Sequence, residues 1–314
     1  MLKQKRVLVT GGTGFIGSHL CRALLTQGEY VICLDNNFTG TLTNVSDLRD
    51  NLDFEFIRHD ITEPIHLEVD RIYHLACPAS PVHYQINGIK TIKTNIIGTL
   101  NMCGLAKRVG ARLLLASTSE VYGDPKVTPQ REDYWGNVNP VGPRSCYDEG
   151  KRVAETLLME YNKSENVDVR ITRIFNTYGP GLNQYDGRVI SNFIVQAQKG
   201  DPITIYGDGR QTRSFCYVSD TVSALLEMME GTDYSKPVNV GNPTEVDIID
   251  VAKIIVKKCC SSSDIVFKDL PVDDPMQRCP DISCINSLVG WEPKVSFDEG
   301  IDKTIEYFSK VVKG

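Results

Sequence analysis

The chain has 314 residues, of which 41% are hydrophobic and 24% charged, and its formal net charge is −6. This composition is typical of a globular protein and excludes disordered, collagen-like and coiled-coil classes, while the length suits one large domain or two moderate ones. The negative balance disfavours nucleic acid and anionic membranes as partners, so any anionic ligand must meet locally placed positive groups.

Cysteine and histidine spacing gives no sign of a metal site. The ten cysteines are scattered without a C-x-x-C pair, and all five histidines lie before residue 84, so we expect no bound metal. The apolar run that follows the charged start, Val7–Val9, is too short for a signal peptide, and no stretch reaches membrane-spanning length. We therefore expect reduced thiols and a cytoplasmic protein.

The first 180 residues alternate between strand and helix patterns. Several of the strands are continuously apolar, as strands of a buried parallel sheet are. The alternation predicts an α/β fold with a Rossmann-type, doubly wound parallel sheet, forming a dinucleotide-binding domain over residues 1–180. Strands are predicted at 6–10, 30–35, 53–58, 71–76, 112–117 and 169–174, and helices from the first glycine-rich turn to about 28, at 89–109 and at 147–162.

The texture changes after residue 180, where strands become shorter and turns more frequent. Helices are predicted at about 189–199, 219–230, 247–258 and 298–310, with loops around Pro271 and 273–275. We expect a smaller mixed α/β lobe over residues 181–314 that packs at the carboxyl edge of the sheet, where open α/β sheets bind ligands. Some crossing of the chain between the two parts is expected.

A glycine-rich turn joins the first strand to the first helix. Gly11, Gly14 and Gly17 form a G-x-x-G-x-x-G motif, which allows a tight turn and close approach of the backbone to a pyrophosphate at the helix N-terminus. Asp35 ends the second strand, where a carboxylate binds ribose hydroxyls and repels a 2′-phosphate, so NAD is favoured over NADP. Asp60, which closes the third strand, could reach the adenine. A plain tight turn and solvated acids are the alternative interpretation, and the combination argues against it.

Tyr147 and Lys151 are four residues apart, which places both side chains on one face of a helix. A lysine ammonium near a phenol favours the phenolate, so the tyrosine can accept a proton from an alcohol while a hydride leaves the same carbon. Thr118, one element earlier, can share that proton network. An ordinary surface pair is the alternative interpretation.

Longer motifs carry a family resemblance. The chain resembles the extended short-chain dehydrogenase/reductases that act on nucleotide sugars, and it is most similar to the UDP-glucuronate decarboxylases, also called UDP-xylose synthases. The resemblance covers nearly the whole chain, and it rests on His-Leu-Ala-Cys-Pro-Ala-Ser-Pro at 74–81, Ala-Ser-Thr-Ser-Glu-Val-Tyr-Gly at 116–123, Arg-Ile-Phe-Asn-Thr-Tyr-Gly-Pro at 173–180, Gln-Thr-Arg-Ser-Phe at 211–215 and Asp-Pro-Met-Gln-Arg-Cys-Pro-Asp at 274–281.

The resemblance implies a reaction, a cofactor and an assembly. Bound NAD would oxidise carbon 4 of the glucuronyl ring, carbon dioxide would leave, and the same cofactor would return its hydride, so that UDP-glucuronate becomes UDP-xylose. A homodimer through the helices at 89–109 and 147–162 is implied as well. The catalytic residues that the resemblance implies are Thr118, Glu120, Tyr147, Lys151 and Arg278.

Binding residues follow in the same way. Arginine forks suit diphosphate and carboxylate groups, and the implied substrate-binding residues are Lys93, Asn176, Arg188, Tyr206, Arg213 and Arg278. Relatives usually carry serine where this chain has Cys77, which weakens the inference at that contact. The predicted cofactor-binding residues are Gly11, Gly14, Phe15, Ile16, Gly17, Asp35, Asn36, Asn37, Thr39, Gly40, Asp60, Ile61, Leu75, Ala76, Cys77, Thr94, Ser117, Tyr147 and Lys151.

Two other functions stay open at this point. A nucleotide-sugar 4-epimerase usually has a small residue in place of Glu120, and a 4,6-dehydratase has aspartate in place of Ser119, because it must protonate a leaving hydroxyl. A non-catalytic NAD-binding scaffold is the third possibility, and the joint presence of Tyr147, Lys151 and Thr118 argues against it. The sequence leaves open whether the 4-keto pentose is released and whether NAD copurifies.

Overall fold

The computed structural model describes residues 4–269 and 277–312. Within these residues the main sheet has seven parallel strands in the order β11-β6-β5-β4-β1-β2-β3. The predicted fold class is therefore confirmed. The strands are β1 (Arg6–Thr10), β2 (Tyr30–Asp35), β3 (Phe54–Arg58), β4 (Arg71–His74), β5 (Arg112–Thr118), β6 (Val169–Ile174) and β11 (Pro237–Val240).

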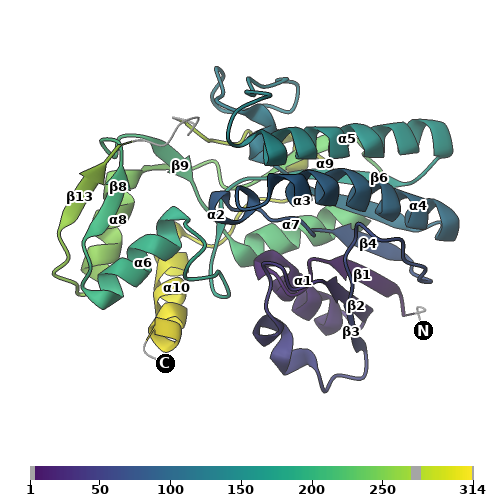
Figure 1. The fold of residues 1–314 in the computed structure, drawn as a ribbon, viewed down its shortest axis with the longest axis horizontal. Helices are drawn as coiled ribbons and strands as arrows, with labels where there is room; N and C mark the ends of the chain where they lie inside the picture. Colours follow the sequence, from purple (N-terminus) through teal and green to yellow (C-terminus); the bar gives the residue numbers. More distant parts are fainter. Residues whose placement is uncertain (1–3, 270–276, 313–314) are drawn as a thin grey trace.

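Helices cover both faces of this sheet (Figure 1). One face carries α1 (Phe15–Thr26) and α7 (Val218–Glu230). The other carries α4 (Thr99–Val109) and α5 (Ser145–Glu165), and α4 continues from α3 (Gly88–Lys93) through a π-helical turn, η2 (Thr94–Gly98). The helix predicted at 89–109 is thus present, with a local widening in its middle.

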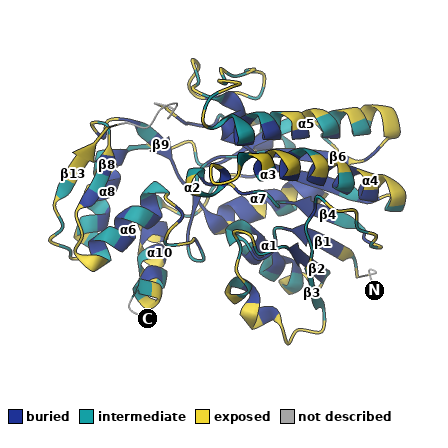
Figure 2. Ribbon diagram, viewed as in Figure 1, coloured by how far each residue is buried: buried dark blue, intermediate teal, exposed yellow. Residues whose placement is uncertain are grey.

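The strand sequences explain why both faces are covered. Successive side chains of a strand point to opposite faces, and here both faces are buried. Val7 and Val9 of β1 lie in the core on the α1 side, whereas Leu8 lies with Ile32 and Leu34 of β2 in the core on the α4 side. Figure 2 shows the exposed residues on the outer turns of α4 and α5, so the continuous apolar runs are those of a sheet buried between two helical layers.

The smaller lobe lies beside the sheet (Figure 1). Its short strands pair as β8 with β13 and β9 with β12, and its helices α6, α8 and α10 pack on one another or on β8. The bounds are α6 (Val189–Lys199), β8 (Ile203–Tyr206), β9 (Thr212–Ser214), β12 (Glu245–Asp247), α8 (Ile248–Lys258), β13 (Ile265–Lys268) and α10 (Phe297–Val312).

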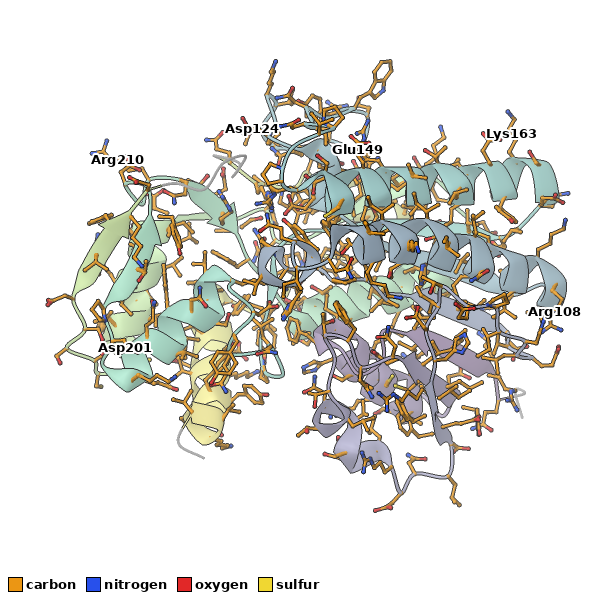
Figure 3. The ribbon with its side chains drawn as sticks, in the orientation of Figure 1. Arg108, Asp124, Glu149, Lys163, Asp201 and Arg210 are labelled. Atoms are coloured by element: carbon orange, nitrogen blue, oxygen red, sulfur yellow. The ribbon has the colours of Figure 1, made fainter. Side chains whose placement is uncertain are left out.

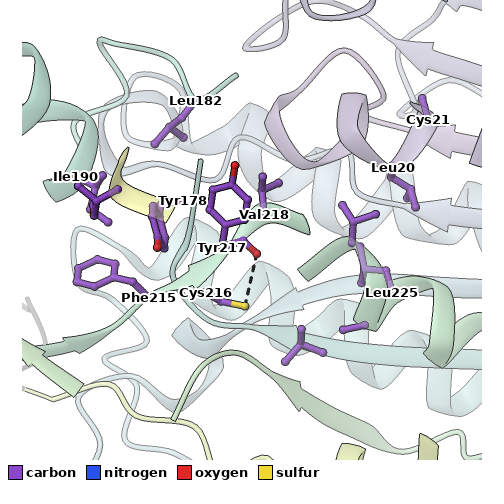
Figure 4. Close-up of a cluster of buried hydrophobic side chains, with 14 of the residues drawn as sticks. Leu20, Cys21, Tyr178, Leu182, Ile190, Phe215, Cys216, Tyr217, Val218 and Leu225 are labelled. Atoms are coloured by element: carbon purple, nitrogen blue, oxygen red, sulfur yellow. Dashed lines mark hydrogen bonds between the residues drawn. The ribbon is translucent and has the colours of Figure 1, made fainter. Parts of the chain in front are cut away.

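The remaining short elements connect the two parts. They are η1 (Leu42–Leu48), α2 (Pro81–Tyr84), η3 (Ser119–Tyr122), β7 (Thr177–Tyr178), β10 (Cys216–Tyr217) and α9 (Ser283–Val289). Figure 4 shows that the lobe and the sheet share one apolar cluster, in which Tyr178, Phe215 and Tyr217 lie near Leu20 of α1 and Leu225 of α7.

The chain crosses between the two parts. Residues 237–240 form β11, which pairs with β6 at the edge of the main sheet, and α7 packs against β5 and β6. The sheet therefore includes segments that follow residue 180, and the division of the chain at that residue stays a prediction. The loop predicted around 273–275 lies outside the described residues.

All ten cysteines have free thiols in the structure. In the described part of the chain, no helix combines the length and apolar character that crossing a bilayer requires. Charged side chains such as Arg108, Lys163 and Asp201 lie on the outside of the molecule (Figure 3).

Candidate active site

A cavity of about 760 Å³ runs along the carboxyl ends of the main strands and reaches the smaller lobe. It passes the point where the strand order reverses, between β1 and β4, which is where doubly wound sheets bind ligands. The predicted residues that line it are Gly11, Gly14, Phe15, Ile16, Gly17, Asp35, Asn36, Thr39, Asp60, Ile61, Leu75, Ala76, Cys77, Thr94, Ser117, Thr118, Glu120, Tyr147, Lys151, Asn176, Arg188, Arg213 and Arg278.

Four predicted residues lie outside this lining. The side chain of Asn37 accepts a hydrogen bond from Thr13 Oγ1 at 3.0 Å, and Gly40 packs so closely on Thr13 that a Cβ would lie 2.3 Å from the same oxygen. Both therefore shape the glycine-rich turn from behind. Lys93 is exposed on α3, and Tyr206 is 44% exposed at the end of β8, so the structure does not bring these two side chains to the cavity.

The glycine-rich turn fits a dinucleotide. Gly11 has a φ of +71°, and a Cβ there would lie 2.9 Å from the backbone of Ala76. A Cβ at Gly17 would lie 2.2 Å from the carbonyl oxygen of Gly11. Helix α1 begins at Phe15 without a side-chain cap, so the amides of its first turn are available to an anion. The turn thus provides the close backbone approach and the positive helix end that a pyrophosphate needs.

Asp35 ties the end of β2 to this turn. Its Oδ2 accepts a hydrogen bond from the amide of Thr13 at 3.1 Å, and its Oδ1 accepts one from the amide of Asn37 at 2.8 Å. A carboxylate has about four acceptor positions, so both oxygens can still accept from ribose hydroxyls. The residues present therefore fit NAD.

Asp60 has a partner that the motifs did not reveal. Lys90 of α3 forms an ion pair with its carboxylate, and Asn36 donates to the same group at 2.9 Å. Burial acts to raise the pKa of Asp60, but the hydrogen bonds from Lys90, Thr62 and Asn36 outweigh it and lower the pKa. Lys90 lines the cavity, one helical turn before Thr94.

Helix α5 carries Tyr147 and Lys151 on its inner face, where both are buried. The hydroxyl of Tyr147 is hydrogen-bonded to Thr118, and Lys151 Nζ donates to the carbonyl oxygen of Ala116 at 2.8 Å. Burial raises the pKa of Tyr147, and Cys77 raises it further, against the lowering effect of Thr118. Burial also lowers the pKa of Lys151. The four-residue spacing therefore brings the predicted pair together, and the tyrosine is a phenol in this state.

Cys77 lies between these groups and the end of β4. Its thiol donates to the carbonyl oxygen of Pro78 at 3.2 Å, and burial raises its pKa. The side chain is therefore a neutral thiol that contributes a weak donor to the cavity wall.

Glu120 lies between two arginines at the other end of the site. Arg144 NH2 donates to its Oε1 at 2.8 Å, and Arg278 donates to its Oε2. Burial acts to raise the pKa of Glu120, but Arg278 and Arg144 lower it to about 2. The carboxyl group is therefore ionised throughout the neutral range.

Arg144 and Tyr84 belong to this site and were missed from the sequence. Arg144 directly precedes α5, three residues before Tyr147, so its position one helical turn away was the available signal. The ring of Tyr84, at the end of α2, stacks on that of Tyr147 with 5.0 Å between centroids, and no local pattern indicates this contact.

Arg188 is held at the mouth of the cavity by neighbouring groups. Its Nε lies 2.9 Å from Asp186 Oδ2, and its NH2 donates to the carbonyl oxygen of Ala79 at 3.2 Å. His83 lies 3.6 Å from the same aspartate. These contacts join the loop after β4 to the loop before α6 across the cavity.

The chain matches a family model and several known proteins. The model described as GDP-mannose 4,6 dehydratase matches residues 8–304. UDP-glucuronic acid decarboxylase 2 of Arabidopsis thaliana is 58% identical over 315 residues, which cover 100% of this chain and 71% of that protein. UDP-glucuronic acid decarboxylase 1 of Danio rerio is 57% identical over 307 residues, covering 98% of this chain and 73% of that protein.

A solved structure shares the architecture. UDP-glucuronic acid 4-epimerase from Bacillus cereus, in complex with UDP-glucuronic acid and NAD, aligns with a TM-score of 0.87 and 29% sequence identity, covering 98% of this chain and 99% of that chain. The sequence identity to the decarboxylases is thus about twice the identity to this epimerase.

Proposed function

The chain belongs to the UDP-glucuronic acid decarboxylase family, and on that premise we propose that it converts UDP-glucuronate to UDP-xylose and carbon dioxide with NAD as cofactor. The family predicted from the sequence motifs is confirmed by these relatives. The observation that carries the proposal is the buried cluster of Glu120, Arg144 and Arg278 on the cavity wall.

Arg278 is suited to bind the carboxylate of the sugar. It is 6% exposed, it lines the cavity, and its Nε has no hydrogen-bond partner among the described residues. A buried donor without a partner costs about 1–3 kcal/mol, and a carboxylate oxygen would satisfy it. Because Glu120 fixes the other side of this guanidinium, the free edge is held in one direction.

The Glu120 carboxylate separates this function from dehydration. A dehydratase needs an acid that protonates a leaving hydroxyl, and Glu120 has a pKa of about 2 because of its two arginines. Carbon dioxide leaves without a proton. An ionised carboxylate that orients Arg278 therefore suits decarboxylation better than loss of water.

Tyr147 is the group that moves the proton at carbon 4. When bound, NAD supplies hydride acceptance and return, and its positive ring favours the phenolate of a nearby tyrosine. Tyr147 takes the proton of the carbon 4 hydroxyl, and Thr118, which is hydrogen-bonded to it, shares that proton. The ketone that results is β to the carboxylate, so the electrons released by loss of carbon dioxide delocalise into it. Lys151, buried beside this pair, holds the cofactor's ribose.

A product assay tests the proposal. Purified protein is incubated with UDP-glucuronate and NAD, and the products are followed by mass. We expect a product lighter by one carbon dioxide that co-migrates with UDP-xylose. A product of unchanged mass would indicate a 4-epimerase, loss of water would indicate a dehydratase, and no loss of carbon dioxide contradicts the proposal.

Replacing one oxygen tests the role of Tyr147. The Tyr147→Phe variant keeps the ring that stacks on Tyr84 but cannot accept the proton, so turnover should fall by about 100-fold or more while NAD still binds. Turnover at the wild-type rate would refute the assigned role.

We also propose a homodimer through the α3–α4 and α5 surfaces, and residence in the cytosol. Apolar side chains are exposed there, including Ile89 at 71%, Ile92 at 41% and Val153 at 38%. An exposed apolar patch on neighbouring helices is typical of an interface. Sedimentation should give a dimer for the wild type and a monomer for Ile89→Asp, and a monomeric wild type contradicts the proposal.

A further inference from the structure

The proposed reaction consumes a proton that the residues discussed above do not supply. Tyr147 takes a proton from the carbon 4 hydroxyl and must return it to the same oxygen when the ketone is reduced. Glu120 is ionised and has none to give. Protonation of carbon 5 after carbon dioxide leaves therefore requires a further acid close to the cluster.

Asp148 is a buried carboxyl group beside this cluster. It follows Tyr147 in the first turn of α5, it is 5% exposed, and its Oδ1 has no hydrogen-bond partner among the described residues. The hydroxyl of Tyr84 is also buried without a partner there, and the ring of Tyr84 stacks on that of Tyr147. Two unpartnered polar atoms thus lie behind the reacting tyrosine.

The charges around Asp148 come from three sides. Glu120 acts on it from η3, Arg278 from the segment after residue 276 and Arg144 from the start of its own helix. Tyr84 of α2, and Cys146 and Glu149 of α5, are its other titratable neighbours. Burial, followed by Glu120, raises the pKa of Asp148 to about 7, although Arg144 and Arg278 act in the opposite direction.

A structural role alone does not account for these properties. An acid in the first turn stabilises a helix when it is ionised, through the helix dipole, and such residues are usually solvated. Asp148 is buried and protonated in about half of the molecules near neutral pH. A group in that state can both give and regain a proton.

We propose that Asp148 is the proton reservoir for decarboxylation, which passes a proton to carbon 5 through water held near Tyr84 and Glu120. This inference rests on the proposed function. The bond between carbon 5 and the carboxyl carbon breaks, its electron pair forms the enolate of the carbon 4 ketone, and that pair then forms the new C–H bond with the transferred proton. Asp148 becomes a carboxylate and regains a proton from solvent. It does not line the cavity, so it acts as a positioning residue through the water.

The pH dependence of turnover tests the proposal. Because the protonated form is the active one, wild-type kcat should fall as pH rises through about 7. The Asp148→Asn variant should lower kcat by about 10–100-fold, lose that falling limb and show a larger solvent isotope effect. Glu149→Gln is the matched control, because it removes one charge from the same helical turn at a half-exposed position, and it should keep the wild-type profile.

Infrared spectroscopy gives a second measurement that does not depend on turnover. The substrate-free wild type should show a carboxylic-acid carbonyl band that disappears as pH rises through about 7, and Asp148→Asn should lack it. Tyr84→Phe keeps the stacked ring and removes one water ligand, so kcat should fall while the band remains.

The outcomes separate the two proposals. A wild type that makes no UDP-xylose overturns the proposed function and this inference with it. An active wild type whose Asp148→Asn variant keeps the same kcat and the same falling limb overturns this inference alone, as does a wild type without the titrating infrared band.

Discussion

Gly17→Ala is the sharpest test of how the glycine-rich turn works. Gly17 lies inside α1, where it packs on the turn that precedes the helix. An added Cβ would lie 2.2 Å from the carbonyl oxygen of Gly11 and 2.9 Å from the Cα of Gly12. Both neighbours are backbone atoms, so no side chain can rotate away. The start of α1 must therefore move outward by about 1 Å to restore an ordinary contact.

Two opposing effects set the size of the change. Alanine in place of glycine inside a helix gains about 0.5–1 kcal/mol. Overpacking against rigid neighbours costs about 1–3 kcal/mol, so the net effect is a loss of stability. At about 2–4 °C per kcal/mol, the melting temperature should fall by a few degrees. The first-turn amides move with the helix, and NAD affinity should weaken about tenfold or more, since each tenfold step is about 1.4 kcal/mol.

Calorimetry and NAD titration measure both quantities. Gly104→Ala is the matched control, because Gly104 also lies inside a helix, α4, and its added Cβ would meet nothing within 4 Å. That variant should gain the helix propensity and leave NAD affinity unchanged. A Gly17→Ala protein that melts no lower than the wild type and binds NAD equally well would refute the reasoning.

Two further predictions concern buried carboxylates. In the folded protein Glu120 has a pKa of about 2, below its ordinary 4.5, so its ionised form adds stability above about pH 4.5, and this is lost as pH falls toward 2. Glu120→Gln should therefore flatten the melting temperature between those pH values and cost about 3–5 kcal/mol at neutral pH; an unchanged melting curve at both ends contradicts this. Asp35→Asn removes an acceptor that holds the Thr13 amide, and isothermal titration should show NAD affinity reduced by about 10–100-fold, with NADP less affected. Equal losses for the two cofactors would speak against a ribose contact.

Local spacing predicted the parts of the site that lie on one element. Gly11, Gly14 and Gly17 lie on one turn, and Tyr147 and Lys151 lie one helical turn apart, so short-range geometry places each group. The strands of the main sheet were predicted to within two residues at each end, except β11. The four residues of β11 carry no signal of their own, because pairing with β6 is what makes them a strand.

Contacts between distant segments could not be predicted in this way. Glu120 meets Arg144 across 24 positions and Arg278 across 158, and spacing does not encode such pairs. The family resemblance supplied Glu120 and Arg278 but gave Lys93 a role for which its side chain is not placed. On α3 the inner positions are Lys90 and Thr94, four residues apart, and Lys93 lies on another side of the same helix.

The position of β11 has a consequence for the birth of the protein on the ribosome. When the first 180 residues have emerged, β6 has one neighbour, β5, and its other edge waits for β11, which is made more than 60 residues later along the chain. An unpaired strand edge is a template for association with other chains. Helix α7, which covers β5 and β6, also follows that point. Synthesis of the nucleotide-binding half therefore passes through a sticky intermediate that only the second half can seal, so splitting the gene at residue 180 should yield an aggregating first fragment.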